Sequence, residues 1–459
     1  MMASEKTALR ELTEKLKQEG FADIRFYIAK TRKFGLNVLD GEKEKSVRSS
    51  ESVYFVEAGK DGKRCCTFFN QLDCAEDVVE QMQVSAMASE EDYHPIPAFE
   101  KELSYTEEFA SLDEREAAET LVKAEQVLRK ESKIDSVSDC SCHQYDEEII
   151  LMDDNGTTLT DCGHSVSVSL GVVSREDGDT EIAWGGRSAQ SLDAIDTEAL
   201  AQEVAELGAQ RLHAKPIASG KYAVILKNDA AAELLEAYLP IFYATEMQNE
   251  MSSLAGKEGE MIAISDINLV EDPKFAQGRV HRHFDDEGTP VSKKYLIHAG
   301  KFESALYNRK SAGKANCQSS GNGFKSDVQA AVGTGVTNVV FENISGNTLS
   351  MEELCQKMGN GLVVTGLEGV FAGVSTITGN FSLLCKGMVV ENGKMTKPFC
   401  EVTIAGSIYE LLKEIVAIGN DPVPTASGSQ FVQTPSLLLK GLAVSGLSLI
   451  HISEPTRRS

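Results

Sequence analysis

The sequence is poor in positive charge and in long hydrophobic runs. Its 459 residues include 45 Lys and Arg against 70 Asp and Glu, which gives a formal net charge of -25. Because so acidic a surface repels phosphates, we expect no nucleic-acid partner and no docking on anionic lipid. No run reaches the ~18 apolar residues that a membrane span requires. Residues 1–20 are charged throughout, so we expect neither a membrane segment nor a secretory signal.

Cysteine is too sparse to predict a disulfide scaffold. The chain has 10 cysteines, and Cys65 and Cys66 are adjacent, which suits reduced thiols better than bridges. Together with the missing secretory signal, this usage predicts a protein of the reducing cytoplasm.

Histidine is scarce as well, and this scarcity bears on zinc binding. A metalloprotease helix needs two histidines about one turn apart, so that both imidazoles reach one zinc ion, and a carboxylate that activates water. The chain's 8 histidines include no pair at i, i+4 or i, i+5, and none lies within residues 214–280. This count excludes a zinc helix of that kind from the chain.

Hydrophobic periodicity predicts an α+β fold in three parts, with antiparallel sheets in two N-terminal α/β modules. Residues 1–97 are expected to form a helix with Leu9, Leu12 and Leu16 on one face, and then an antiparallel meander with turns at Asp40-Gly41 and Asp61-Gly62. Residues 110–216 are expected to form a helix, strands and a second helix. Residues 220–446 contain many short strands separated by glycines, which is typical of a mostly antiparallel, barrel-like sheet. Residues 447–459 break the alternating pattern, and we interpret them as a non-native tail.

Cysteine and histidine cluster at Cys140–His143 and at Cys162–His164, a set that on paper suits a structural zinc site. Asn155-Gly156 between the clusters is a strong signal for a hairpin turn. A two-residue turn there places Cys162 opposite Ile149, so that the clusters lie roughly 20 Å apart along the strands. Because a zinc–sulfur bond is only ~2.3 Å long, ordinary strand residues are the favoured interpretation.

Two weaker patterns suggest other chemistry. Residues 319–326 are glycine-rich, but they lack the Gly-Lys-Ser/Thr ending of a phosphate loop, and a tight turn is favoured. Four cysteines are candidate thiol nucleophiles, although none has a histidine nearby in the sequence. They are Cys65, Cys317, Cys385 and Cys400.

A series of short motifs follows in order through the C-terminal part of the chain. They are Phe284–Pro290 (FDDEGTP), Ser320–Gly323 (SGNG), Gly379–Ser382 (GNFS), Val390–Lys394 (VENGK), Thr403–Gly406 (TIAG) and Val416–Asp421 (VAIGND). In this order they resemble the TldD/PmbA metallopeptidase family, and the combination is specific although each motif alone is weak. The resemblance extends over nearly the whole chain, to about Gly446.

The resemblance implies a protease assembly in which a zinc-bearing TldD-type subunit pairs with a PmbA (TldE)-type subunit that lacks the metal. A TldD-type chain carries His-Glu-x-x-x-His and a later cysteine ligand. Here Glu236 and Ile241 stand where the histidines would be, Ala237 stands at the catalytic glutamate, and no cysteine follows Asp421. The resemblance therefore implies a PmbA-type subunit with no catalytic residue, metal ligand or cofactor of its own, and with zinc held by the partner.

The implied assembly is a dimer or higher hetero-oligomer that acts on extended or unfolded peptides. An edge strand can hold such a peptide through main-chain hydrogen bonds. Two segments are expected to border the peptide cleft, and their residues are Asp285, Asp286, Glu287, Gly288, Gly321, Asn322, Gly323 and Phe324.

Two alternatives to this assignment stay open. The first is a metal-independent peptide-binding or scaffolding protein that acts alone. The second is an enzyme that binds metal through His281, His283 and Asp285, although these residues equally suit a strand that runs into a solvated acidic turn.

Overall fold

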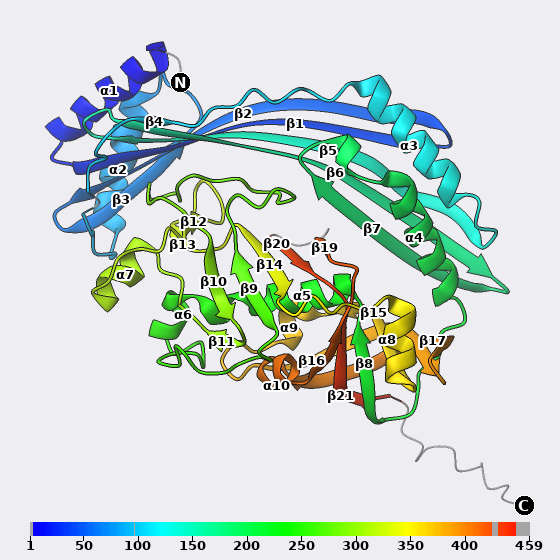
Figure 1. Ribbon diagram of the computed structural model, residues 1–459. Helices are drawn as coiled ribbons and strands as arrows, with labels where there is room; N and C mark the ends of the chain where they lie inside the picture. Colours follow the sequence, from blue (N-terminus) through cyan, green and yellow to red (C-terminus); the bar gives the residue numbers. More distant parts are fainter. Residues whose placement is uncertain (1–2, 96, 425–429, 447–459) are drawn as a thin grey trace, which may run out of the picture.

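A curved, seven-stranded sheet forms the N-terminal half of the molecule (Figure 1). The structure is a computed structural model that describes residues 3–95, 97–424 and 430–446. The strands lie in the order β3-β2-β1-β5-β6-β4, and β7 also pairs with β6. Their bounds are β1 (Ala22–Leu39), β2 (Glu42–Lys60), β3 (Lys63–Phe69), β4 (Leu103–Ser104), β5 (Ile134–Asp153), β6 (Thr158–Glu176) and β7 (Asp179–Ala189).

Tight turns connect the first three strands. Asp40-Gly41 joins β1 to β2, and Asp61-Gly62 joins β2 to β3. All four residues have positive φ angles, between 52° and 77°, which is the conformation that a type I′ turn requires. The turns expected in the N-terminal meander are thereby confirmed.

The two faces of the sheet have different partners because strand side chains alternate between faces. On β1, Phe26, Ile28, Phe34 and Leu36 are buried with helices on one face. Ala29, from the other set of positions, packs with Phe284 of the C-terminal half. The helices are α1 (Ala3–Gln18), α2 (Ala75–Ala88), α3 (Glu114–Leu128) and α4 (Thr197–Arg211), with a short 3-10 helix η1 (Leu192–Ala194) before α4.

Pairing between β1 and β5 joins the first and middle segments of the chain into this single sheet. The register runs from Arg25 opposite Asp153 to Asn37 opposite Ser141. The sequence predicted antiparallel strands in both segments but did not predict that the two sets would pair.

The β5–β6 hairpin corrects one expected pairing. Cys162 lies opposite Glu148, not Ile149, so the expected register was wrong by one residue. The cause is a longer loop, because the Asp153 carboxylate accepts hydrogen bonds from the amides of Asn155 and Thr157. Cys142 pairs with Val168, so the two cysteine and histidine clusters remain well separated along the strands.

The C-terminal half contains a closed five-stranded barrel, a second sheet and a small hairpin. The barrel strands lie in the order β17-β16-β15-β8-β21, β17 also pairs with β21, and β18 flanks β21. Their bounds are β8 (Gly220–Leu226), β15 (Gly361–Glu368), β16 (Asn380–Glu391), β17 (Lys394–Ser407), β18 (Ile415–Ile418) and β21 (Leu437–Ser445). The expected α+β class with a barrel-like C-terminal part is confirmed.

The second sheet of this half has the order β11-β10-β9-β14-β20-β19. Its strands are β9 (Ile267–Glu271), β10 (Lys294–His298), β11 (Lys301–Phe302), β14 (Asn338–Asn343), β19 (Val423–Pro424) and β20 (Phe431–Thr434), and the hairpin is β12 (Gly323–Lys325) with β13 (Val332–Thr334). The helices are α5 (Asn228–Tyr238), the 3-10 helix η2 (Leu239–Phe242), α6 (Ala244–Gln248), α7 (Arg309–Ala315), α8 (Met351–Met358), α9 (Val370–Gly373) and α10 (Ile408–Lys413).

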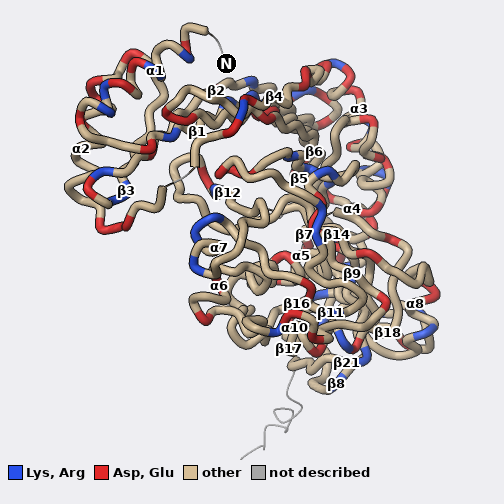
Figure 2. Tube along the Cα trace, turned by 60° about the vertical axis from the view of Figure 1, so that its left-hand side comes forward, with Lys and Arg blue, Asp and Glu red and all other residues tan. Residues whose placement is uncertain are grey.

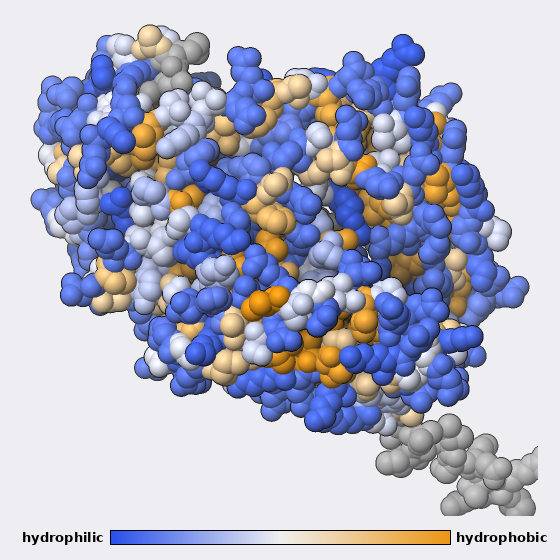
Figure 3. Space-filling model, viewed as in Figure 1, coloured by the Kyte–Doolittle hydropathy of each residue, from blue (hydrophilic) through white to orange (hydrophobic). Residues whose placement is uncertain are grey.

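The N-terminal sheet arches over the C-terminal half, so that its face without helices is turned toward the barrel and the second sheet (Figure 1). Hydrophilic residues cover most of the face seen in Figure 3, and hydrophobic residues gather over its lower, C-terminal part. No helix within the described ranges is long and apolar enough to cross a membrane.

Candidate functional site

Helix α5 occupies the position where the resemblance places a zinc-binding helix. Glu236 accepts a hydrogen bond from the Gln430 amide at 3.0 Å, and Ile241 is 1% exposed and packs in the largest hydrophobic core. The α-helix ends at Tyr238, and Pro240 lies in η2, so positions 236 and 241 do not share one α-helix.

The side chains at these positions do not fit a zinc ion. Ala237 and Ile241 carry no donor atom, and both pack against the hydrophobic core. Within the described residues, no group of three or more His, Cys, Asp or Glu side chains is arranged to hold a metal ion. On this chain α5 is a packing element.

The histidines near the acidic turn are engaged separately. His283 stacks on Tyr105, and its Nδ1 lies 2.9 Å from Oδ1 of Asp161 on β6. Nε2 of His281 lies 2.9 Å from the Phe275 carbonyl oxygen. The alternative metal site of His281, His283 and Asp285 is thus not assembled among the described residues.

The acidic turn Asp285–Gly288 docks on β12. The buried Asp285 carboxylate accepts hydrogen bonds from the amides of Gly323, Glu287 and Thr289, at 2.8, 3.0 and 2.8 Å. Asp286 donates its amide to the Gly323 carbonyl oxygen, and its carboxylate accepts from the Lys325 amide. The structure therefore brings together the two segments that the sequence singled out.

The contacts between the acidic turn and β12 require a glycine at position 323, and the buried side-chain amide of Asn322 holds the neighbouring backbone. A Cβ on Gly323 would lie 2.3 Å from Oε2 of Glu287. Asn322 is fully buried, and its amide nitrogen donates to both carboxylate oxygens of Glu271 and to the Gly335 carbonyl. These residues hold β12 in place against the acidic turn.

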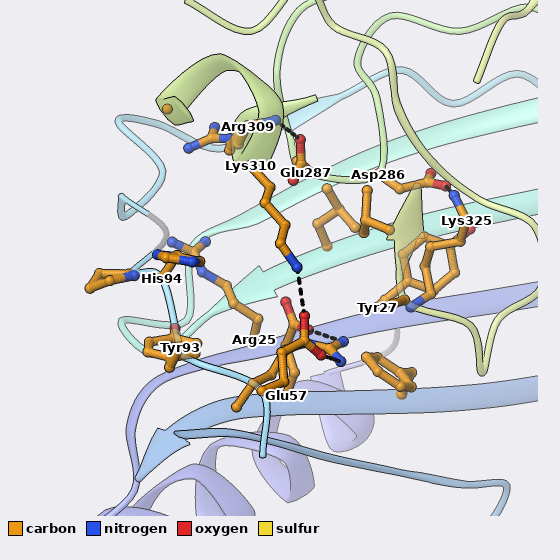
Figure 4. A pocket seen from close by; sticks show the side chains of 18 of the residues that line it. Arg25, Tyr27, Glu57, Tyr93, His94, Asp286, Glu287, Arg309, Lys310 and Lys325 are labelled. Atoms are coloured by element: carbon orange, nitrogen blue, oxygen red, sulfur yellow. Dashed lines mark hydrogen bonds and ion pairs between the residues drawn. The ribbon is translucent and has the colours of Figure 1, made fainter. Parts of the chain in front are cut away.

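A cavity of about 660 Å³ lies between the N-terminal sheet and the C-terminal half (Figure 4). Asp286 and Glu287 line it, whereas the other expected cleft residues are not among its lining residues. Those other residues are Asp285, Gly288, Gly321, Asn322, Gly323 and Phe324.

Most lining residues were not predicted from the sequence, because seven separate segments contribute them. β1 contributes Arg25 and Tyr27, β2 contributes Phe55 and Glu57, and Arg64 comes from β3. The segment after α2, Leu151 of β5, helix α7 and the β12 hairpin contribute the rest, beside Asp286 and Glu287. One signal was available in the sequence, namely three cations within the seven residues of α7 (Figure 2).

Ion pairs and aromatic contacts organise the charges of the cavity. Glu57 pairs with Arg64 at 2.6 Å, and Glu91 pairs with Lys310 at 3.0 Å. The Lys325 ammonium lies 3.6 Å from the centre of the Phe55 ring, and burial lowers the pKa of Lys325 to about 8.

Glu287 has a strongly shifted pKa. Burial, reinforced by the negative charge of Asp285, raises the pKa of this carboxyl to about 8. Its Oε2 accepts a hydrogen bond from the Arg309 amide at 2.7 Å, which favours the charged form but does not offset burial. At neutral pH, Glu287 is therefore mostly protonated.

Family models match two parts of the chain. Residues 107–212 match the PmbA/TldA metallopeptidase central domain, and residues 219–446 match the PmbA/TldA metallopeptidase C-terminal domain. The chain is 28% identical over 339 residues to the metalloprotease PmbA of Escherichia coli O157:H7, which covers 73% of this chain and 71% of that protein.

Solved structures share the whole fold. TldE from Thermococcus kodakarensis superposes with a TM-score of 0.85 at 22% identity, covering 96% of this chain and all of the other. A protein of Thermotoga maritima superposes with a TM-score of 0.81 at 26% identity, covering 95% of this chain and all of the other.

Proposed function

The chain belongs to the PmbA/TldA metallopeptidase family, and on that premise we propose that it is a PmbA (TldE)-type subunit without zinc. It would act in the cytoplasm with a TldD-type partner that carries the metal. The observation that carries this proposal is the segment formed by α5 and η2, where Ala237 and Ile241 offer no ligand atom and Glu236 accepts a hydrogen bond from a backbone amide.

The chemistry of peptide hydrolysis assigns the cutting step to the partner. A catalytic zinc ion lowers the pKa of a bound water and polarises the scissile carbonyl. Because this chain offers no ligand set for the ion at α5, it would contribute peptide binding instead. The cavity between its two halves supports that role, since it is concave and lined by aromatic and charged side chains.

The cavity also favours a second candidate, a peptide-binding protein that acts alone. Both halves of this chain contribute to the lining, with β1, β2 and β3 on one side and α7 and the β12 hairpin on the other, so the chain by itself forms a concave site. The two candidates differ in what a TldD-type chain would add, because only the first predicts hydrolysis after mixing.

Reconstitution tests the proposal. The purified chain, a homologous chain that carries His-Glu-x-x-x-His, and their mixture are assayed with a fluorogenic, unstructured peptide. We expect cleavage to rise at least tenfold in the mixture and to disappear when the partner's catalytic glutamate is replaced by glutamine. Chelator-sensitive cleavage by this chain alone, or no gain on mixing with an active partner, would contradict the proposal.

A further inference from the structure

The cavity concentrates positive charge in a chain whose net charge is -25. Six of its lining residues are basic, whereas five are acidic. The basic residues are Arg25, Arg64, Arg309, Lys310, Lys314 and Lys325. α7 contributes three of them and stands out as a blue segment in Figure 2.

The acidic groups of the cavity are already engaged. Glu57 and Glu91 pair with Arg64 and Lys310, and Asp92 pairs with Lys63. Asp286 is bonded to Arg282, at 2.6 Å, and to the Lys325 amide. Glu287 is mostly protonated at neutral pH because its pKa is about 8. The acidic residues of the cavity therefore leave little negative charge to balance its remaining basic side chains.

Within the part of the chain that the structure describes, Arg309 is the basic residue of the cavity whose side chain most clearly lacks a partner for one of its buried polar atoms. Its Nε atom is buried and lacks a hydrogen-bond partner among the described residues. Burial, together with the nearby positive charge of Arg309, lowers the pKa of Arg25. Figure 4 shows Arg309 on α7 in the upper part of the view and Arg25 on β1 below it. An anion between them would relieve their repulsion.

The rest of the lining suits the apolar part of a peptide. Aromatic and aliphatic side chains cover the sheet side of the cavity. They are Tyr27, Phe55 and Leu151 of the strands, and Phe99, which belongs to the same hydrophobic cluster as Tyr27 and Leu151. A volume of about 660 Å³ is within the ~300–1,000 Å³ range of ligand pockets and accommodates a few residues of extended chain.

We propose that this cavity binds a carboxylate carried by an extended peptide. Arg309 would be the main counter-charge, Arg25 and Lys314 would add positive charge nearby, and the aromatic wall would contact the neighbouring side chain. The inference rests on the proposed function only in taking a peptide as the ligand. A peptide C-terminus and an Asp or Glu side chain present the same group, so the experiment includes both.

The test is isothermal titration calorimetry of the full chain with three acetylated peptides. The first is Ac-Ala-Leu-Ala-Phe-Ala-Leu with a free C-terminal carboxylate, the second is its C-terminal amide, and the third is the amide with Asp replacing the fifth residue. We expect at least one carboxylate-bearing peptide to bind tenfold or more tightly than the neutral amide. The free acid reports a C-terminal carboxylate, and the Asp peptide reports a side-chain carboxylate.

Variants tie the preference to the cavity. Arg309→Gln should remove most of the difference between charged and neutral peptides, and Arg309→Lys should retain part of it. Lys357→Gln, an exposed position on α8, is the matched control and should leave the difference unchanged. If Arg309→Gln does not fold, Lys314→Gln carries the same comparison.

Equal binding of all three peptides, no binding at millimolar concentration, or a preference that survives these replacements would overturn the inference. Equal binding, or a preference that survives the replacements, would not contradict the cleavage expected when the chain is mixed with its partner. Conversely, a lack of cleavage on mixing contradicts the proposed function. The calorimetric comparison can still be interpreted in that case, because it uses this chain alone. The two failures are therefore distinguishable.

Discussion

Glu287 and Asp285 are buried carboxyl groups two residues apart, held in different ways. Asp285 accepts three backbone amides, whereas Glu287 accepts only that of Arg309. Burial is the largest cause in both, and it raises the pKa of Asp285 to about 6 and that of Glu287 to about 8. The extra amide donors explain why Asp285 is the more acidic of the two.

Replacement of Glu287 by glutamine should stabilise the protein at alkaline pH. The pKa of Glu287 is higher in the folded chain than in the unfolded chain, so folding favours the protonated form. Stability is therefore lost as pH rises from about 4.5 to about 8, and glutamine, which stays neutral, avoids this loss. We expect Glu287→Gln to raise the free energy of unfolding by about 2 kcal/mol at pH 8.5 and to change it little at pH 4.5.

Urea unfolding at the two pH values measures this difference. Glu44→Gln, at an exposed position of β2, is the control and should stay within about 0.5 kcal/mol of the wild-type value at both. A Glu287→Gln variant that is equally destabilised at both pH values would show that the carboxylate is needed for packing instead.

At the scale of elements, the β12 strand depends on the glycine that precedes it. Gly321 has a φ of 74°, and a Cβ there would lie 2.6 Å from the Pro290 carbonyl oxygen. Gly313 on α7 is the opposite case, because a Cβ would meet nothing within 4 Å. The same substitution should therefore have opposite effects at the two positions.

We expect Gly321→Ala to destabilise the protein by about 2–4 kcal/mol, because left-handed strain and a backbone clash add. Gly313→Ala should stabilise it by up to about 1 kcal/mol through helix propensity. Thermal unfolding of both variants checks this contrast, and a Gly321→Ala variant as stable as the wild type would show that the turn can shift without loss.

Elements with strong local signals were predictable from the sequence. The first helix was expected from Leu9, Leu12 and Leu16, and all three leucines are buried in α1. The Asp-Gly turns fixed two hairpins because their backbone conformation is a local property. The Asn155-Gly156 hairpin shows the limit, since the Asp153 side chain selects a longer loop and moves the register by one residue.

At the scale of the whole molecule, a buried carboxylate joins the two halves. Asp161 on β6 is 1% exposed and accepts hydrogen bonds from the His283 amide, at 2.7 Å, and from its imidazole. Phe284 packs beside it against Ala29, Ile149 and Leu159 of the N-terminal sheet. This contact holds the acidic turn at the cavity.

Asp161→Asn should weaken the contact between the N-terminal sheet and the C-terminal half. Asparagine keeps the volume but loses the charge and one acceptor, so we expect a loss of about 1–3 kcal/mol and earlier proteolytic cleavage between the halves. Asp135→Asn, at an exposed surface ion pair, is the matched control and should change neither readout. Equal behaviour of the two variants in urea unfolding and limited trypsin digestion would contradict this role of Asp161.

The cavity could not be predicted from the sequence for a physical reason. Its cations lie on β1, β3, α7 and β12, and only long-range pairing of β1 with β5 and docking of the halves bring them together. Local patterns report helices, turns and single motifs, so they identified Asp286 and Glu287 but not Arg25 or Arg64.

The zinc content of the purified full-length chain is the most direct measurement of the central claim. Inductively coupled plasma mass spectrometry after exhaustive dialysis, with peptidase activity measured on the same sample, should find far less than one zinc ion per chain and no hydrolysis. One tightly bound zinc ion per chain, together with cleavage that a chelator abolishes, would contradict the account.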